Sequence, residues 1–464
     1  MRGASIDRIV VINDLARPMG GASALALTSA RAFRALGHAV TLLVGDEGDD
    51  GSLAAAGIDC VALGQGRLLS RPKVEAAMAA LWNRRAGRMV AAWIAQHDTP
   101  RTVYHLHGWL QILSPAVFHA LAPVRDRLVI SAHDFFLACP NGAFADLRTG
   151  QPCPHVPLSR ACITAPCDRH SRSHKLLRVV RHAIQTRVFD PAHSPPVLAI
   201  HAGMAPYLAR AGIPGEAIHA LPNPVVPWSA NRIAAEDNRE VLFVGRLEET
   251  KGPDLAAAAA RAAGVPLRLI GTGALEGSLR ARYPEASFSG RLSPPQIAHV
   301  AQRARLLVMP SRYPEPYGLV AMEAARSGLP VVLAGTALLA EDLVRHGAGV
   351  AVDPRDTAGF ATVLGELAQD NARVRAMSEA AISLPTDLAL SPEMWITRLL
   401  DFYSARLAAL AVSMPGQRPD AAPRGAEPDW LPERALLERT ARARPLSTAE
   451  LAAGGRRSRS RSGE

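Results

Sequence analysis

The stretch that decides the fold is Arg8–Val44, RIVVINDLARPMGGASALALTSARAFRALGHAVTLLV. It opens with a short β-branched run and continues through a loop that contains Gly20 and Gly21. A run rich in Ala and Leu follows and ends near Gly37, before a second apolar run, Val40–Val44. A strand, a glycine loop, a helix and a second strand in this order predict a β–α–β unit from a parallel sheet covered by helices.

Similar strand-like runs recur along the chain. Four lie in the first half: Thr102–Leu106, Leu128–Ala132, Val197–Ile200 and Ile218–Leu221. Four more lie in the second half: Val241–Val244, Leu267–Ile270, Leu306–Met309 and Pro330–Leu333. A proline cluster and a polar stretch over residues 222–239 separate the two sets. We therefore predict an α/β protein with two Rossmann-like domains, residues 1–227 and 228–390, that face each other across a cleft.

The last part of the chain has a different character. An amphipathic helix is expected over residues 391–412, crossing back to the first domain. Residues 413–464 are rich in Pro, Gly, Ala and Arg, which predicts a disordered tail.

The bulk composition limits the class of protein. The chain has 464 residues and a formal net charge of +10, which favours anionic partners or simply reflects free use of Arg. We expect nucleotide-linked ligands and no nucleic acid. The first residues lack a signal peptide and no run of about 18 apolar residues occurs, so we expect a cytoplasmic protein. Its five cysteines are then thiols or ligands, not structural disulfides.

The strongest chemical motif is the segment 310–324, PSRYPEPYGLVAMEA. A strand leads into its proline-rich loop, and a helix is expected to begin near Gly318. The first backbone N–H groups of a helix lack helical acceptors and can bind a diphosphate. These groups belong to Gly318, Leu319 and Val320. Glu315 lies just before this position and can reach a sugar, while Glu323 lies inside the helix and can reach a ribose.

A second motif, FVGRLEETKG, spans residues 243–252. Arg246 and Lys251 follow a predicted strand and precede a helix. Two cations at the carboxyl end of a strand can neutralise a diphosphate and stabilise it as a leaving group.

Together these motifs resemble the retaining GT-B glycosyltransferases of family four, also called group 1. The resemblance extends from about residue 8 to about residue 410 and excludes the tail. It rests on the pair Glu315 and Glu323, the phosphate loop around Gly245 and Lys251, and four shorter matches. These are Gly20-Gly21, Leu221-Pro222-Asn223, Gly271-x-Gly273 and Ser289-Gly290-Arg291. Two positions depart from the family pattern: Pro224, where glycine is usual, and Tyr317, where phenylalanine is usual.

The resemblance implies roles for individual residues. Arg246 and Lys251 would hold the diphosphate, Glu315 the hydroxyls of the transferred sugar, and Glu323 the ribose. His133, which follows a predicted strand, would lie near the sugar and the acceptor. The implied catalytic residues are Glu315, His133, Arg246 and Lys251. The implied donor-binding residues are Glu323, Gly318, Leu319, Val320, Gly20, Gly21, Gly245, Gly271 and Arg291.

The resemblance also implies a reaction. A hexose would pass from a UDP- or GDP-linked donor to a glycan or lipid-linked acceptor, with retention and without a metal or other cofactor. The similar bacterial subset takes part in surface-polysaccharide synthesis, in which the enzyme could be peripheral on the inner face of the membrane. Two alternatives stay open: a GT-B nucleotide-sugar epimerase and a non-catalytic nucleotide-sugar-binding protein. The particular sugar, base, linkage and acceptor do not follow from the sequence.

An insertion over residues 134–170 carries four of the cysteines: Cys139, Cys153, Cys162 and Cys167. Four thiols can bind Zn²⁺, although no Cys-x2-Cys pair is present, and a loop with buried thiols is the other interpretation. The following segment, residues 172–189, predicts a basic amphipathic helix. That helix fits either an anionic lipid surface or a solvated face, and the sequence leaves both open.

Overall fold

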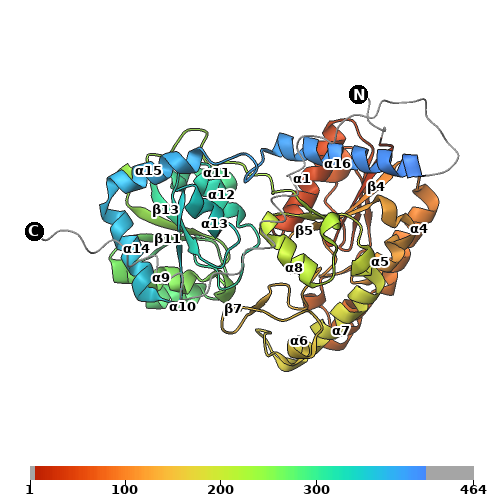
Figure 1. Ribbon diagram of the computed structural model, residues 1–464, viewed down its shortest axis with the longest axis horizontal. Helices are drawn as coiled ribbons and strands as arrows, with labels where there is room; N and C mark the ends of the chain where they lie inside the picture. Colours follow the sequence, from red (N-terminus) through yellow and green to blue (C-terminus); the bar gives the residue numbers. More distant parts are fainter. Residues whose placement is uncertain (1–5, 414–464) are drawn as a thin grey trace, which may run out of the picture. The chain divides into compact units, whose positions relative to one another are not determined.

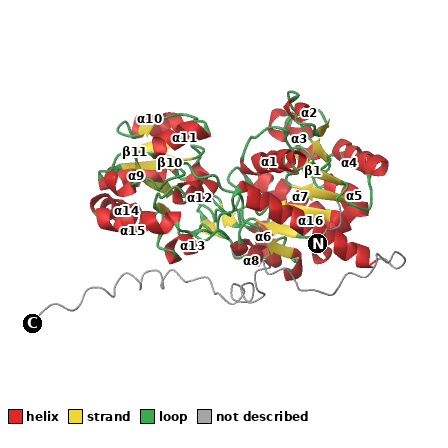
Figure 2. Ribbon diagram, turned by 90° about the horizontal axis from the view of Figure 1, so that it is seen from above, coloured by secondary structure: helices red, strands yellow, loops and turns green. Residues whose placement is uncertain are grey.

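The computed structural model describes residues 6–413, which belong to one compact unit. Their strands form two parallel sheets and one small antiparallel pair, and helices cover both sheets (Figures 1 and 2). Ser413 is the last residue of a helix, and the remainder of the predicted tail lies outside the described residues. The proposed domain boundary after residue 227 stays a prediction.

The first sheet has seven parallel strands in the spatial order β3-β2-β1-β4-β5-β8-β9. They are β1 (Arg8–Asn13), β2 (Val40–Val44), β3 (Asp59–Ala62), β4 (Thr102–Leu106), β5 (Leu128–Ala132), β8 (Val197–Ala199) and β9 (Ile218–Ala220). Their residues are mostly buried on both faces, as expected for parallel strands between two helical layers. The two edge strands are the exceptions, because β3 is exposed or half-buried and two of the three residues of β9 are half-buried.

The second sheet has six parallel strands in the order β12-β11-β10-β13-β14-β15. They are β10 (Glu240–Val244), β11 (Leu267–Ile270), β12 (Ser287–Phe288), β13 (Ala304–Met309), β14 (Val331–Ala334) and β15 (Gly349–Val352). In each sheet the strand order reverses at one point, between β1 and β4 and between β10 and β13. Open sheets of this Rossmann type bind ligands at the carboxyl ends of the strands beside such a point.

Helices connect the strands of both sheets. Those of the first half are α1 (Gly21–Ala35), α2 (Ser52–Ala55), α3 (Lys73–Leu81), α4 (Arg84–His97), α5 (Ala116–Leu121), α6 (Arg160–Thr164), α7 (Arg172–Phe189) and α8 (Ala205–Arg210). Those of the second half are α9 (Pro253–Ala263), α10 (Glu276–Arg282), α11 (Pro294–Ala301), α12 (Leu319–Ala325), α13 (Ala340–Arg345), α14 (Thr357–Gln369) and α15 (Asn371–Ile382). The apolar residues of α1 lie on one side of the helix. Its buried face is formed by Leu25, Ala26, Ala30 and Phe33.

The last helix, α16 (Pro392–Ser413), packs on the first sheet although it follows the second in the chain. Trp395, Leu399 and Tyr403 of α16 belong to the same apolar cluster as strands β1 and β2 and helix α1. Figure 1 shows α16, in blue, beside α1, in red. The prediction that the C-terminal helix returns to the first domain is therefore confirmed.

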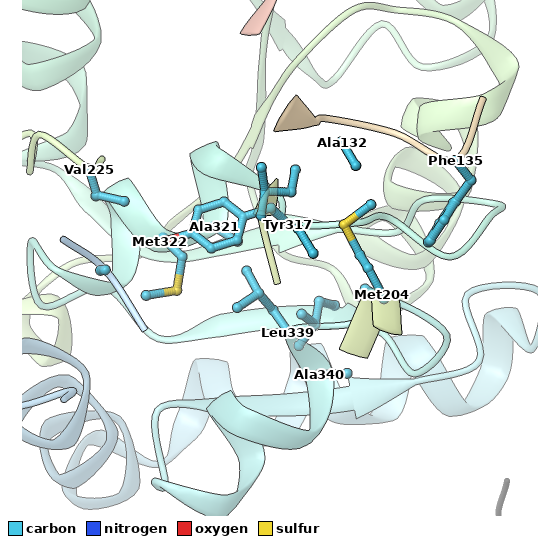
Figure 3. Close-up of a cluster of buried hydrophobic side chains, with 14 of the residues drawn as sticks. Ala132, Phe135, Met204, Val225, Tyr317, Ala321, Met322, Leu339 and Ala340 are labelled. Atoms are coloured by element: carbon cyan, nitrogen blue, oxygen red, sulfur yellow. The ribbon is translucent and has the colours of Figure 1, made fainter. Parts of the chain in front are cut away.

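A second and larger apolar cluster contains side chains from both halves of the chain. Figure 3 shows part of it: Ala132, Phe135, Met204 and Val225 come from the first half, and Tyr317, Met322 and Leu339 from the second. The insertion over 134–170 begins at this cluster and contains the antiparallel pair β6 (Ala145–Asp146) and β7 (Gln151–Pro152).

Candidate active site

Two loops of the second sheet meet at its strand-order reversal. One follows β10 and carries Lys251, and the other follows β13 and carries Glu315. The backbone N–H of Arg312 donates to the Thr250 carbonyl oxygen at 2.9 Å and joins the loops. Gly252 permits this approach, because a Cβ atom there would lie 2.2 Å from the carbonyl oxygen of Pro310.

Lys251 and Glu315 form an ion pair at the meeting point of these loops. Lys251 Nζ lies 2.7 Å and 2.8 Å from the two carboxylate oxygens of Glu315 and 3.0 Å from the Tyr313 hydroxyl. Ser311 donates to Glu315 Oε2 at 2.9 Å. The structure thus brings together the predicted diphosphate cation and the predicted sugar-binding carboxylate. Tyr313 and Ser311 were not predicted as site residues, although both lie in the quoted motif.

The ion pair keeps both groups charged. Burial alone would raise the pKa of the Glu315 carboxyl, but Lys251 and the hydrogen bonds from Tyr313 and Ser311 hold it below its usual value. Burial likewise opposes the charge on Lys251, yet Glu315 and Tyr313 outweigh it and raise the pKa of the ammonium. A charged cation and a charged carboxylate are therefore preformed beside each other.

Arg246 is not part of this group. Its side chain is 65% exposed and its guanidinium pairs with Glu248 at 2.8 Å. Glu248 lies two residues further along the same loop and is the only ion-pair partner of Arg246 among the described residues. The structure therefore places Arg246 in the predicted loop but does not bring it to Lys251 and Glu315.

The predicted glycine loops of the second sheet lie next to one another. Gly245 N–H donates to the Ile270 carbonyl at 2.9 Å, and Gly271 N–H donates to the Gly290 carbonyl at 2.7 Å. Arg291, which follows, is exposed. A hollow of about 530 Å³ lies beside this loop. It is lined by Ser289, Leu292, Pro295, Gln296, His299 and Val300.

The glycine loop of the first half reaches the start of α12. A Cβ atom on Gly21 would lie 3.4 Å from Leu319 Cδ1, whereas one on Gly20 would meet no atom within 4 Å. Gly318 precedes α12 in the left-handed conformation, with φ of 74°, and Val320 is in the first turn. The structure thus brings the two predicted backbone elements, one from each half, to the same place.

Glu323 lies in α12 and is half-buried, so it is not a solvent-exposed helix residue. Burial raises the pKa of its carboxyl, and a hydrogen bond with Trp228 opposes that shift. Trp228 was not predicted, because nothing in its local sequence links it to a residue 95 positions away.

The unusual Tyr317 has a visible structural role. Its ring is buried in the cluster of Figure 3, and its hydroxyl donates to the Leu388 carbonyl at 2.6 Å. The same hydroxyl lies 3.3 Å from the carbonyl oxygen of Asn223. Phenylalanine would lack this hydroxyl, whose single hydrogen is directed to the closer Leu388 carbonyl. Tyrosine at this position therefore ties the start of α12 to Leu388, beside the 221–223 segment.

His133 follows β5, at the carboxyl edge of the first sheet. Its Nε2 lies 2.9 Å from His107 Nδ1, and its own Nδ1 is buried without a hydrogen-bond partner among the described residues. Burial lowers the pKa of His133 to about 4 and raises that of the adjacent Asp134 to about 6. His133 is therefore neutral at pH 7.

The four cysteines of the insertion do not form the zinc site that the sequence left open. Among residues 6–413, no group of three or more His, Cys, Asp and Glu side chains is arranged to hold a metal ion. Instead Lys175 points toward the thiols, with Nζ 3.1 Å from Cys167 Sγ and 4.0 Å from Cys162 Sγ. Burial raises the pKa of Cys139 to about 11, which keeps that thiol protonated.

Three basic side chains of α7 that were expected to face either lipid or solvent are turned inward, whereas membrane association itself stays a prediction. Lys175 is buried by the cysteines, Arg178 pairs with Asp168 at 3.1 Å, and Arg181 donates to the Trp109 carbonyl oxygen at 3.1 Å. The exposed side carries apolar Leu176 and Val180 together with the basic residues Arg172 and Arg187. Within residues 6–413, no helix has the length and apolar character that a bilayer span requires.

Comparison with known proteins gives a match in the second half of the chain. Residues 228–384 match the family model for glycosyl transferases group 1. We call this segment, which is similar to that family, the group 1 region. The group 1 region includes both loops of the Lys251–Glu315 pair and all of α12.

Sequence similarity to individual relatives extends beyond the group 1 region. The chain is 31% identical to glycogen synthase of Mycobacterium tuberculosis over 271 residues, 54% of this chain and 63% of the relative. It thus spans less than two thirds of that relative's length.

Two solved structures cover almost all of the described chain. Sucrose-phosphate synthase of Thermosynechococcus elongatus has a TM-score of 0.64 at 17% identity, covering 87% of this chain and 100% of that one. HepE of Anabaena, solved in complex with UDP, has a TM-score of 0.60 at 17% identity and covers 86% and 100%. These likenesses show the GT-B fold, and the predicted fold class is confirmed.

Proposed function

We propose that this chain is a retaining hexosyltransferase that uses a nucleotide-diphosphate sugar. The observation that carries the proposal is the Lys251–Glu315 pair, a charged and partly buried cation and carboxylate at the strand-order reversal of the group 1 region. The cation suits a departing diphosphate, and the carboxylate suits the hydroxyls of the sugar attached to it.

The proposed step breaks the bond between the sugar C1 and the diphosphate oxygen. Lys251 stabilises the negative charge that develops on the diphosphate. Arg246 separates from Glu248 and stabilises the same charge. The acceptor hydroxyl forms its bond to C1 on the same face, and its proton passes to the departing phosphate oxygen. Glu315 holds the sugar hydroxyls and Glu323 the ribose. Since the cations are side chains, we propose that no metal is required.

We propose a glycan or lipid-linked acceptor, used in cell-surface polysaccharide synthesis. The UDP complex of HepE supports testing UDP-sugars first, with GDP-sugars as the next class. His133, at the edge of the first sheet, is the residue that we place beside the sugar and the acceptor.

The first prediction concerns the Lys251–Glu315 pair, and its test first requires a donor that the chain binds. We expect thermal-shift screening against UDP-, GDP- and ADP-sugars to identify a stabilising donor, because a ligand that binds only the folded state raises its stability. With that donor and a mixture of glycan acceptors, release of nucleoside diphosphate should fall about 100-fold or more in Lys251→Ala and Glu315→Gln. EDTA should leave the rate unchanged.

Matched controls are available for both variants. Lys73→Ala removes another lysine at an exposed position, and Glu341→Gln changes a carboxylate that is 83% exposed; both should keep full activity. Unchanged turnover in Glu315→Gln would refute the role of the pair. Interconversion of the donor sugar without any acceptor would instead identify an epimerase, and donor binding without turnover a binding protein.

A further inference from the structure

Three buried side chains connect α16 to the half-buried His133 through an unbroken series of hydrogen bonds. The Tyr403 hydroxyl lies 2.6 Å from His105 Nδ1, and His105 Nε2 lies 2.8 Å from the Ser131 hydroxyl. His107 Nε2 lies 3.2 Å from His105 Nδ1, and His107 Nδ1 lies 2.9 Å from His133 Nε2. We call Tyr403, His105, His107 and His133 the histidine relay.

All three imidazoles of the relay are neutral at physiological pH. Burial lowers the pKa of His105 to about 3 and that of His133 to about 4, and it also holds the pKa of His107 well below its usual value. A neutral imidazole has one N–H and one bare nitrogen, so each ring in the relay must donate at one nitrogen and accept at the other.

Tyr403 determines the direction of the relay. Its side chain is fully buried, and within the described chain His105 Nδ1 is the one hydrogen-bond partner of its hydroxyl. If the hydroxyl accepted from His105, its own hydrogen would be buried without an acceptor, which is costly. Tyr403 therefore donates, His105 Nδ1 accepts, and His105 carries its proton on Nε2, from which it donates to Ser131.

The tautomer of His105 then determines the tautomers of His107 and His133. Because His105 Nδ1 is bare, the His107 nitrogen that faces it must be the protonated one, since two bare nitrogens would repel. The single lone pair of His105 Nδ1 is then shared between the Tyr403 hydroxyl at 2.6 Å and the more distant His107 N–H at 3.2 Å. His107 Nδ1 is consequently bare and accepts from Nε2–H of His133. This leaves His133 Nδ1 bare, and that atom has no partner within the described residues.

We infer that Tyr403 is a positioning residue that holds His133 in the Nε2–H tautomer, so that Nδ1 offers a lone pair to a hydroxyl of the sugar or acceptor. The role for the bound hydroxyl rests on the proposed function, whereas the tautomer rests on the relay alone. His133 Nδ1 is covered in the structure, so the hydroxyl must displace a neighbouring group to reach it. Tyr403 of α16 thus determines whether His133, at the edge of the first sheet, can accept a hydrogen bond at Nδ1.

The direct test is the tautomer of His133, measured from the ¹⁵N shifts of its ring nitrogens in histidine-labelled protein and assigned with His133→Asn. We expect the Nε2–H form in the unmodified chain. Tyr403→Phe removes only the hydroxyl, and the relay can then reverse, so a substantial fraction of Nδ1–H should appear. His107→Asn interrupts the relay at a second point and should also lose the single tautomer.

Tyr207→Phe is the matched control, because it removes a hydroxyl from a half-buried tyrosine outside the relay. It should leave the His133 shifts unchanged. In turnover, Tyr403→Phe should lower kcat about tenfold while the donor KM changes less than about twofold. An Nδ1–H tautomer in the unmodified chain, or unchanged His133 shifts in both relay variants, would overturn the inference. Absence of transfer with every donor would instead remove the proposed function and leave the tautomer result standing.

Discussion

At the scale of single residues, Asp134 makes stability depend on pH. Burial raises the pKa of its carboxyl from 3.8 to about 6, although the Phe136 N–H and Arg181 oppose the shift. The folded state therefore binds this proton more tightly than the unfolded state, so the contribution of Asp134 to stability falls as the pH rises from about 4 to about 6. Asp134→Asn should stabilise the chain at pH 7.5 by about 1–3 kcal/mol and have little effect at pH 4. Urea denaturation at the two pH values measures this.

Asn retains the oxygen that accepts from Phe136, so the substitution mainly removes the buried charge. Asp50→Asn, at an exposed position, should change stability equally little at both pH values. A stabilisation by Asp134→Asn that is the same at pH 4 and pH 7.5 would contradict the raised pKa.

Single residues also show what the sequence can predict about this site. Lys251 and Glu315 were predictable, because each follows an apolar run and the carboxyl ends of parallel strands share one edge. Their direct pairing was not, since it needs two loops 64 positions apart to touch. The contact between His105 and Tyr403 joins residues 298 positions apart and depends on how α16 packs, which no local pattern encodes.

At the scale of elements, the loops after β10, β11 and β12 form a unit that tolerates no side chain at Gly271. Its φ is +138°, and a Cβ atom would lie 1.9 Å from the carbonyl oxygen of Gly245. Gly271→Ala must push two backbone segments apart, so we expect a loss of about 3 kcal/mol or more in unfolding free energy and loss of donor binding. Gly277→Ala, in α10 with no atom within 4 Å, should instead stabilise by about 0.5–1 kcal/mol. Equal effects of the two substitutions would show that the loops do not pack this way.

The elements that the sequence analysis did not include comprise apolar ones, such as β15 and α14, and several strands with weak apolar signals. β3 is exposed or half-buried along its length, β12 has two half-buried residues, and β6 and β7 have two residues each. α7 was predicted with the right bounds but with its basic face outward. The error arose because Lys175, Arg178 and Arg181 find partners in the insertion and around Trp109, which lie elsewhere in the sequence.

At the scale of the whole molecule, α16 links the end of the second half to the core of the first. Leu390 and Val225 are joined by a backbone hydrogen bond of 2.8 Å just before α16 begins. The helix then buries Leu399 and Tyr403 against the first sheet and α1, and Tyr403 enters the histidine relay. The stability of the first sheet and the chemistry of His133 should therefore both depend on this one helix.

Leu399→Ala should lower the stability of the first sheet and leave the tautomer of His133 unchanged. Leu399 is fully buried, so truncation should cost about 2–5 kcal/mol of unfolding free energy. Met394→Ala, at a position 38% exposed on the same helix, should cost much less. Because the removed contacts lie in the cluster of the first half, hydrogen exchange should speed up in β1 and β2 before it does in β10 and β13. The His133 tautomer should persist, since the Tyr403 hydroxyl remains. Equal loss of protection in both sheets would mean that the two halves unfold as one unit, and that α16 does not stabilise the first selectively.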